Sequence, residues 1–284
     1  IFRLTTFGES HGPAIGGVID GCPAGLRLDF KAIQHRLALR SPQNVAGATK
    51  RNEADKVEFL SGIYEGKTLG TPIAFFVRNK DVRSEDYAEL QHIYRPGHAD
   101  YTYDMRYGIR DYRGGGRASA RETASRVVAG AVARQLLTEK GITIQAEVVQ
   151  VGAETNPVKW DAYLAEVRAK GDSIGGVVRC TITGVPVGVG EPIFDKLQSH
   201  LAFAMMSING CKGFEYGSGF EGVTLKGSEM YLTENQSLIS GGIAGGISDG
   251  TPLVFRCVFK PTATNRKTLE AVSHDFKLGR HDAC

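Results

Sequence analysis

The stretch GGVIDGCPAGLRLDFKAIQHRLA, residues 16–38, decides the fold class. A β-like run, a glycine-proline turn and a helical pattern follow one another in it. The same order recurs in GGVVRCTITGVPVGVGEPIFDKLQSHLA, residues 175–202, and both copies carry a Gly-x-Pro-x-Gly turn. We interpret the two stretches as a duplicated strand-turn-helix unit. Chance similarity of two common units is the alternative.

Helical periodicity marks the segments 30–39, 118–137 and 193–206. Short β-like runs bounded by Gly and Pro occur at residues 16–20, 72–77, 175–182 and 253–259. No linker rich in Pro or Ser separates the two halves of the chain. We therefore expect an α+β protein in which residues 1–284 form one domain.

The composition excludes several classes of protein. The chain has 284 residues with 42% hydrophobic and 23% charged side chains and a net charge of +3, which is typical of a globular domain and identifies no partner. Its apolar runs are too short to cross a membrane, and no signal peptide opens it. The five cysteines form no CxxC pair, which argues against a disulfide framework and a thiolate zinc site. We expect a cytoplasmic protein.

Arginine is concentrated in the middle of the chain. Residues 95–134 contain eight arginines, four acids and no lysine. A solvated surface normally mixes lysine with arginine, whereas exclusive use of arginine favours planar, bidentate recognition of carboxylate or phosphate. The alternative is a helix whose arginines pair with neighbouring carboxylates, and we expect this of Arg126 and Arg134.

A glycine loop, RGGGRAS at residues 113–119, leads into the long helical segment. Ser119 and Glu122 have the spacing of a capping box. Free amides and the helix dipole at such a junction favour an anion, so we predict a phosphate cradle. The alternative is a flexible turn or an Arg-Gly segment that binds RNA. RNA-binding segments of that kind are usually repeated, and this one occurs once.

Residues 61–68, SGIYEGKT, resemble a phosphate-binding P-loop but do not fit it. Three residues instead of four separate the first glycine from Gly-Lys-Thr, and a β-like run follows where a helix is required. We reject a P-loop and expect Lys67 to lie in a surface turn.

Three histidines lie in sequences that suggest chemistry. His11 stands between Ser10 and glycine, His98 follows Arg95-Pro96-Gly97, and Gly279-Arg280-His281-Asp282 combines an acid, a base and an anion-binding group. Imidazole titrates near neutral pH, so these clusters together indicate proton transfer to an anionic substrate. No spacing of histidines or acids indicates a metal site.

These segments, taken in order, resemble the chorismate synthase family from residue 2 to residue 284. The motifs that carry the resemblance are GESHG at 8–12, GGVIDGCP at 16–23, RPGHAD at 95–100, RGGGRASARET at 113–123, MSIN at 206–209, GGIAGGIS at 241–248, KPT at 260–262 and GRHD at 279–282. Each motif alone is modest evidence, whereas the ordered set is very specific. The resemblance implies a β-α-β sandwich fold and a homotetramer.

The resemblance also implies an activity, the conversion of 5-enolpyruvylshikimate 3-phosphate to chorismate and phosphate, which needs reduced FMN without consuming it. The implied FMN contacts are Arg117, Ala118, Ser119, Asn209, Gly210, Gly245, Lys260, Pro261, Thr262, Ala263, Thr264 and Arg280. Arg40 matches a position associated with NADPH. The implied substrate contacts are Arg40, Arg95, Arg121 and Arg280. The partner is a phosphorylated small molecule rather than nucleic acid or a membrane.

The chemistry assigns further roles by the same resemblance. His11 would protonate the departing phosphate, with Ser10 and Ser119 as hydrogen-bond partners. His98 would keep the reduced flavin protonated, and Asp282 would help to remove the ring hydrogen.

The chain departs from the family's pattern in places. Ser41-Pro42-Gln43-Asn44 and Ala46 replace residues on the NADPH side, and Leu238 and Ile239 replace polar residues. The stretches near Asn156 and between Thr264 and Gly279 are shorter than in the family. We expect further residues at the termini and in these loops.

Overall fold

The computed structural model describes residues 1–40, 55–79, 91–231, 239–263, 268–273 and 278–282. For residues 231, 268–273 and 278–282 it describes the backbone alone. The chain divides into two compact units, unit 1 with Ile1–Leu136 and Thr268–Asp282, and unit 2 with Leu137–Lys267. We predicted that the whole chain forms one domain. Whether the two units pack into one domain is not tested by this division, so that expectation stays a prediction.

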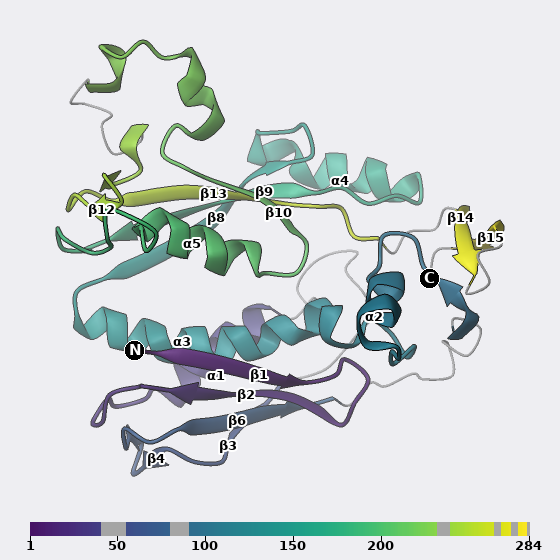
Figure 1. Ribbon diagram of the computed structural model, residues 1–284, viewed down its shortest axis with the longest axis horizontal. Coiled ribbons are helices and arrows are strands. Elements are labelled where there is room, and N and C mark those ends of the chain that lie inside the picture. Colours follow the sequence, from purple (N-terminus) through teal and green to yellow (C-terminus); the bar gives the residue numbers. More distant parts are fainter. Residues whose placement is uncertain (41–54, 80–90, 232–238, 264–267, 274–277, 283–284) are drawn as a thin grey trace. The chain divides into compact units, whose positions relative to one another are not determined.

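Unit 1 is built on an antiparallel sheet of four strands in the order β1-β2-β6-β3 (Figure 1). The strands are β1 (Arg3–Gly8), β2 (Ala14–Asp20), β6 (Ile73–Arg78) and β3 (Val57–Phe59). Alternate residues of β6 are fully buried, as expected for a strand with one face on the core. Gly17 lies opposite Phe75, and a Cβ at Gly17 would lie 2.8 Å from that ring. The glycine therefore gives the aromatic ring its place in the core.

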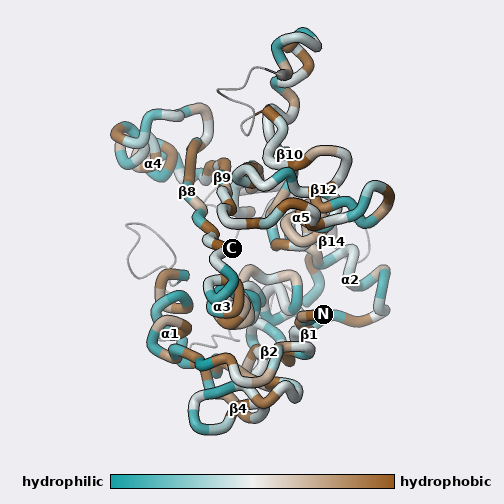
Figure 2. Tube along the Cα trace, turned by 90° about the vertical axis from the view of Figure 1, so that its left-hand side faces the viewer, coloured by the Kyte–Doolittle hydropathy of each residue, from teal (hydrophilic) through white to brown (hydrophobic). Residues whose placement is uncertain are grey.

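Two helices cover the buried face of this sheet, α1 (Phe30–Leu39) and α3 (Thr123–Glu139). Ile33 and Leu37 of α1 are fully buried, and burial of each contributes about 1.5–3 kcal/mol. Asp29 caps α1 by accepting a hydrogen bond of 2.9 Å from the Ala32 amide. Hydrophilic and hydrophobic residues mix along α1 (Figure 2), as expected of a helix with one buried face.

Unit 1 also contains two smaller sheets and a short helix. They are the hairpin of β4 (Ile63–Tyr64) and β5 (Lys67–Thr68), the sheet of β7 (Ile93–Tyr94), β14 (Thr268–Ser273) and β15 (Leu278–Asp282), and α2 (Asp100–Tyr107). The hairpin turns through Glu65 and Gly66, both with positive φ. Because residues 61–68 form a hairpin and Lys67 is exposed in it, the rejection of a P-loop is confirmed.

Unit 2 has its own antiparallel sheet, in the order β10-β13-β9-β8, and its own core. Its elements are β8 (Thr143–Val151), α4 (Trp160–Ala169), β9 (Gly176–Thr183), α5 (Leu197–Met206), β10 (Cys211–Tyr216), β11 (Ile243–Ala244), β12 (Ile247–Ser248) and β13 (Leu253–Phe259). Helix α5 packs on this core through Leu197, Leu201 and Met205. Burial raises the pKa of the Cys257 thiol to about 12, so this core cysteine is unreactive at neutral pH.

Two sequence-based helix boundaries differ from the structure, and two helices were not predicted. The helix expected at 193–206 begins at Leu197, because Phe194 has a φ of 58° and leaves the helical region. The helix expected at 118–137 becomes two 3₁₀ turns, Gly116–Ala118 and Ala120–Glu122, before α3 begins at Thr123. Helices α2 and α4 were missed, since their polar residues obscure the apolar periodicity.

The presence of both helices and several separate antiparallel sheets confirms the α+β class. Both stretches of the suspected duplication contain a strand followed by a helix, β2 with α1 and β9 with α5. That order alone does not establish a duplication, so the duplication and the β-α-β sandwich stay predictions.

Candidate functional site

The loop between β1 and β2 holds Ser10 and His11 in unit 1. Gly8 and Ile15 are partners in the antiparallel pair, so residues 9–14 must turn back tightly. The Gly12 amide donates a hydrogen bond of 3.1 Å to the Glu9 carbonyl. Ser10 is 1% exposed, and its Oγ lies 3.0 Å from His11 Nδ1. The hydroxyl and the imidazole, which are neighbours in sequence, thus contact each other in the structure.

The glycine loop packs against this imidazole. A Cβ built on Gly114 would lie 2.3 Å from Cε1 and 2.4 Å from Nδ1 of His11. Gly114 also has a φ of 86°, in the left-handed region that favours glycine. Because Gly114 has no side chain, the His11 ring has room to occupy this position.

Replacing Gly114 with Ala should displace the imidazole and lower turnover by at least about tenfold, since misplaced groups lose catalysis steeply. Gly108→Ala is the matched control. Gly108 has a φ of 73°, and a Cβ there meets nothing within 4 Å, so that variant carries the backbone strain without the clash. Steady-state kinetics of the two variants test the prediction. Equal turnover in both variants would show that the contact with His11 is unimportant.

Charged residues surround the Ser10-His11 loop. The Arg113 guanidinium contacts both carboxylate oxygens of Asp111 at 2.9 Å, and these hydrogen bonds hold the pKa of Asp111 below its usual value. The positive form of His11 lowers the pKa of Asp111 further. Burial raises the pKa of Glu9, against the opposing charge of Arg117. The Asp111 carboxylate lies close enough to His11 for the two groups to interact electrostatically.

Arg117 ties the glycine loop to β1. Its NH1 donates to the Gly8 carbonyl at 3.1 Å, and its NH2 donates to Thr6 Oγ1 at 2.6 Å. The expected capping box is wrong in detail. Ser119 Oγ accepts from the Arg121 amide at 3.2 Å, while the buried Glu122 carboxylate accepts from Thr6 Oγ1 at 2.8 Å and pairs with Arg126 at 2.9 Å. The loop therefore enters a 3₁₀ turn instead of an α-helix, and the cradle expected at an α-helix N-terminus is not formed in that way.

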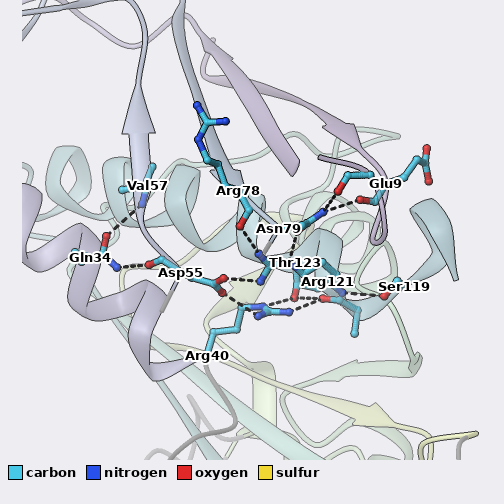
Figure 3. Close-up of polar contacts among 12 residues, drawn as sticks. Glu9, Gln34, Arg40, Asp55, Val57, Arg78, Asn79, Ser119, Arg121 and Thr123 are labelled. Atoms are coloured by element: carbon cyan, nitrogen blue, oxygen red, sulfur yellow. Dashed lines mark hydrogen bonds and ion pairs between the residues drawn. The ribbon is translucent and has the colours of Figure 1, made fainter. Parts of the chain in front are cut away.

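Arg121 and Arg40 meet at one buried carboxylate (Figure 3). Arg121 NH1 lies 2.6 Å from Asp55 Oδ1, and Arg40 NH1 lies 3.4 Å from Asp55 Oδ2. Arg121 also donates from Nε to Asn79 Oδ1 at 2.9 Å. Arg40 donates further to Thr123 Oγ1 and to the Ala120 carbonyl, each at 3.1 Å. Two guanidinium groups share one carboxylate, so these three side chains carry a net charge of +1.

Arg95 and His98 lie in a second polar cluster of unit 1. Arg95 contacts the two oxygens of Asp100 at 2.8 and 2.9 Å and the Gly114 carbonyl at 3.0 Å. Burial alone would raise the pKa of Asp100, but Arg95 brings it below the usual value. This carboxylate therefore stabilises the fold above its ordinary pKa, and the stabilisation is lost as the pH falls through the lowered pKa. His98 Nδ1 lies 3.1 Å from the Pro96 carbonyl, an acceptor, so Nδ1 carries a proton.

Unit 2 brings part of the predicted cofactor set together. The Lys260 amide donates to the Gly210 carbonyl at 2.9 Å, which places Asn209 and Gly210 beside Lys260 at one end of the β10-β13 pair. The Thr262 carbonyl accepts from Ser173 Oγ at 2.7 Å. Gly245 lies in the β11-β12 turn, whose Gly246 carbonyl accepts from the first residue of α5. Asn209 comes after the other end of α5, a ten-residue helix about 15 Å long. Gly245 therefore lies at one end of α5, and Asn209, Gly210 and Lys260 lie beyond the other end.

Several predicted residues lie beyond what the structure describes. Thr264 lies outside the described residues. For Arg280 and Asp282 the backbone alone is described, in β15 opposite Glu270 and Thr268. Three histidines outside these motifs, His35, His92 and His200, are exposed.

The sequence analysis missed Asp55, Asn79 and Asp111. Asp55 and Asn79 belong to no recognisable motif, so their contacts with Arg121 could not be foreseen. Asp111 stands two residues before Arg113, and this spacing in an arginine-rich segment is a signal that could have found it.

Among the described residues, no helix is long and apolar enough to cross a membrane. In the same part of the chain, no group of three or more His, Cys, Asp or Glu side chains could hold a metal ion.

Comparisons with known proteins agree on one family. The family model described as "Chorismate synthase" matches residues 2–284. The chain is 50% identical to the chorismate synthase of Christiangramia forsetii over 319 aligned positions, which cover 100% of this chain and 90% of that protein. It is 49% identical to the chorismate synthase of Flavobacterium psychrophilum, with 100% and 89% covered. A crystal structure of chorismate synthase matches with a TM-score of 0.75 at 34% identity, covering 92% of this chain and 85% of that one. The chain therefore belongs to the chorismate synthase family.

Proposed function

We propose that this chain eliminates phosphate from 5-enolpyruvylshikimate 3-phosphate to give chorismate, and that reduced FMN is required without being consumed. Family membership gives the coarser function, a lyase of the shikimate pathway of aromatic biosynthesis. The observation that carries the finer proposal is the partly buried contact of 3.0 Å between Ser10 Oγ and His11 Nδ1, in a loop against which the arginine-rich segment packs.

The positive charge in unit 1 suits the substrate, which bears two carboxylates and a phosphate. Arg40, Arg121 and Asp55 together carry +1, and Asp55 fixes the orientation of both guanidinium groups. Arg95 is oriented in the same way by Asp100. An arginine held by a carboxylate loses less side-chain entropy when it binds an anion. We assign Arg40, Arg95 and Arg121 to substrate binding on this basis and on the family motif, and Arg280 on the family motif alone.

His11 is the acid in this proposal. Phosphate leaves poorly from an unactivated ring carbon, and a proton delivered to its oxygen makes it a better leaving group. His11 supplies that proton, while Ser10 and Ser119 hold the imidazole and the phosphate by hydrogen bonds.

His98 and Asp282 act at the other steps. The proton on His98 Nδ1 is fixed by the Pro96 carbonyl, so Nε2 is the atom that can exchange a proton with the cofactor. Asp282 would help to take the ring hydrogen when substrate and cofactor are bound.

The described residues fit FMN in their chemistry. Arg117, Asn209 and Lys260 are N–H donors suited to a phosphate and to ring carbonyls, and Gly245 leaves open space where a Cβ would lie. Bound reduced FMN would supply electron density to the substrate as the C–O bond breaks and recover it as hydrogen leaves. The proposed contacts also include Ala118, Ser119, Gly210, Pro261, Thr262, Ala263, Thr264 and Arg280.

The test is phosphate release under anaerobic conditions with FMN reduced by dithionite. We expect phosphate from the enolpyruvyl substrate with reduced FMN and none with oxidised FMN. A second arm replaces dithionite with NADPH, and activity there would assign NADPH as the reductant. No phosphate with reduced FMN would overturn the proposal, and salt-dependent RNA binding without FMN binding would support the Arg-Gly alternative. We further propose a cytoplasmic homotetramer, which sedimentation can check.

Replacing Asp282 with Asn should slow removal of the ring hydrogen while substrate and cofactor still bind. Asn keeps the size of the side chain and removes its basicity. Single-turnover kinetics with substrate deuterated at the departing hydrogen measure this step. We expect a larger isotope effect in the variant than in the wild type. Full activity with an unchanged isotope effect would remove the role assigned to Asp282.

A further inference from the structure

Asn79 connects two parts of the site in unit 1. It follows β6 directly, and both ends of its amide are used (Figure 3). Nδ2 donates to the Glu9 carbonyl at 3.0 Å and to the Gly12 carbonyl at 2.8 Å. Oδ1 accepts from Arg121 Nε at 2.9 Å.

The Nδ2 contacts span the Ser10-His11 loop. Glu9 and Gly12 flank Ser10 and His11, so one amide group holds the carbonyls on both sides of the Ser-His pair. The Asn79 main-chain amide adds a hydrogen bond of 3.1 Å to the Pro13 carbonyl. The loop is thus fixed to the end of β6 at three carbonyl groups.

The Oδ1 contact fixes an arginine. Arg121 is 4% exposed, and Asp55 and the Arg78 carbonyl hold its other nitrogens at 2.6 and 3.4 Å. A carboxylate in place of the amide would keep the acceptor for Arg121. It would replace the two donors to Glu9 and Gly12 with a repelling oxygen. A mutation can therefore remove the contacts of Nδ2 while it keeps the contact of Oδ1.

The geometry points to Asn79 as a positioning residue that sets His11 in register with Arg121. This inference rests on the proposed function, in which His11 delivers a proton to an anion that Arg121 helps to hold. A displacement of 1 Å between such groups can cost a factor of about 100 in rate. One side chain, bonded to Arg121 and to the carbonyls on both sides of Ser10 and His11, keeps that distance fixed.

The first experiment is a double-mutant cycle. Asn79→Ala should lower kcat by about 10- to 100-fold in the wild type, but by less than about threefold in a His11→Ala background, where no acid remains to be positioned. Arg78→Ala is the matched control. It removes a side chain that is 62% exposed and keeps the carbonyl bonded to Arg121, so we expect kcat within about twofold of the wild type. An equal loss in both backgrounds would overturn the positioning role.

The second experiment does not depend on turnover. Histidine-labelled protein is titrated by NMR, and the His11 signal is assigned from its absence in His11→Ala. We expect the midpoint of His11 to move by at least about half a pH unit in Asn79→Asp, and by less than about 0.2 in Arg78→Ala. An unchanged His11 midpoint in Asn79→Asp would contradict the inference even if the wild type failed to make chorismate. Asn79→Asp also serves if Asn79→Ala does not fold, because it retains the contact with Arg121.

Discussion

Replacing His11 with Ala should lower turnover by roughly two to four orders of magnitude, the usual contribution of a general acid. Ser10 is buried with its Oγ 3.0 Å from His11 Nδ1, and Gly114 packs on the imidazole, so the substitution removes the group that this part of the site positions. We assign the FMN contacts to other residues, and FMN affinity should therefore stay within about twofold of the wild type.

Steady-state kinetics and calorimetry with FMN measure the two effects separately. His35→Ala is the matched control, because His35 is exposed on α1 and we expect no loss of turnover there. A His11→Ala variant with wild-type activity would remove the acid from the proposed mechanism. Loss of FMN affinity would instead assign His11 to cofactor binding.

Replacing Asp55 with Asn should destabilise the protein by about 3–5 kcal/mol, because the change removes the charge of the carboxylate that pairs with the buried Arg121 guanidinium. The side chains of Asp55 and Arg121 are each 3% exposed, and their atoms are 2.6 Å apart. Arg40 loses the same partner. The variant should also bind the anionic substrate more weakly, since two arginines lose their orientation.

Urea denaturation gives the free energy of unfolding. Glu58→Gln is the control, since it removes a surface ion pair with Arg78 whose side chains are 44% and 62% exposed, and such pairs contribute at most about 1 kcal/mol. Equal losses in the two variants would contradict the account of Asp55 as a buried countercharge.

Much of the fold could be predicted from short-range patterns. The apolar spacing of Ile33 and Leu37 fixed α1 within residues 30–39, and the run at 253–259 coincides with β13. The start of α5 could not be predicted, because the positive φ of Phe194 is set by its surroundings and not by its residue type. The division into two compact units could not be predicted either, because no change in amino-acid composition accompanies it.

The candidate site was predictable where its residues are neighbours in sequence. Ser10 and His11 were expected to interact and do so at 3.0 Å. The contacts of Arg121 with Asn79 and Asp55, and of Asn79 with Glu9, join positions 42 to 70 residues apart, and no local pattern encodes them. The ion pair of Arg121 with Asp55 could likewise not be predicted, since this acidic partner lies in another segment of the chain.

The most direct test of the proposed reaction counts products against the cofactor. The enzyme is mixed anaerobically with an excess of the enolpyruvyl substrate and a small amount of reduced FMN, and chorismate, phosphate and the flavin spectrum are followed together. The account predicts one chorismate for each phosphate, many turnovers for each FMN, and flavin that is still reduced at the end. Phosphate without chorismate, or one FMN oxidised for each product formed, would contradict it.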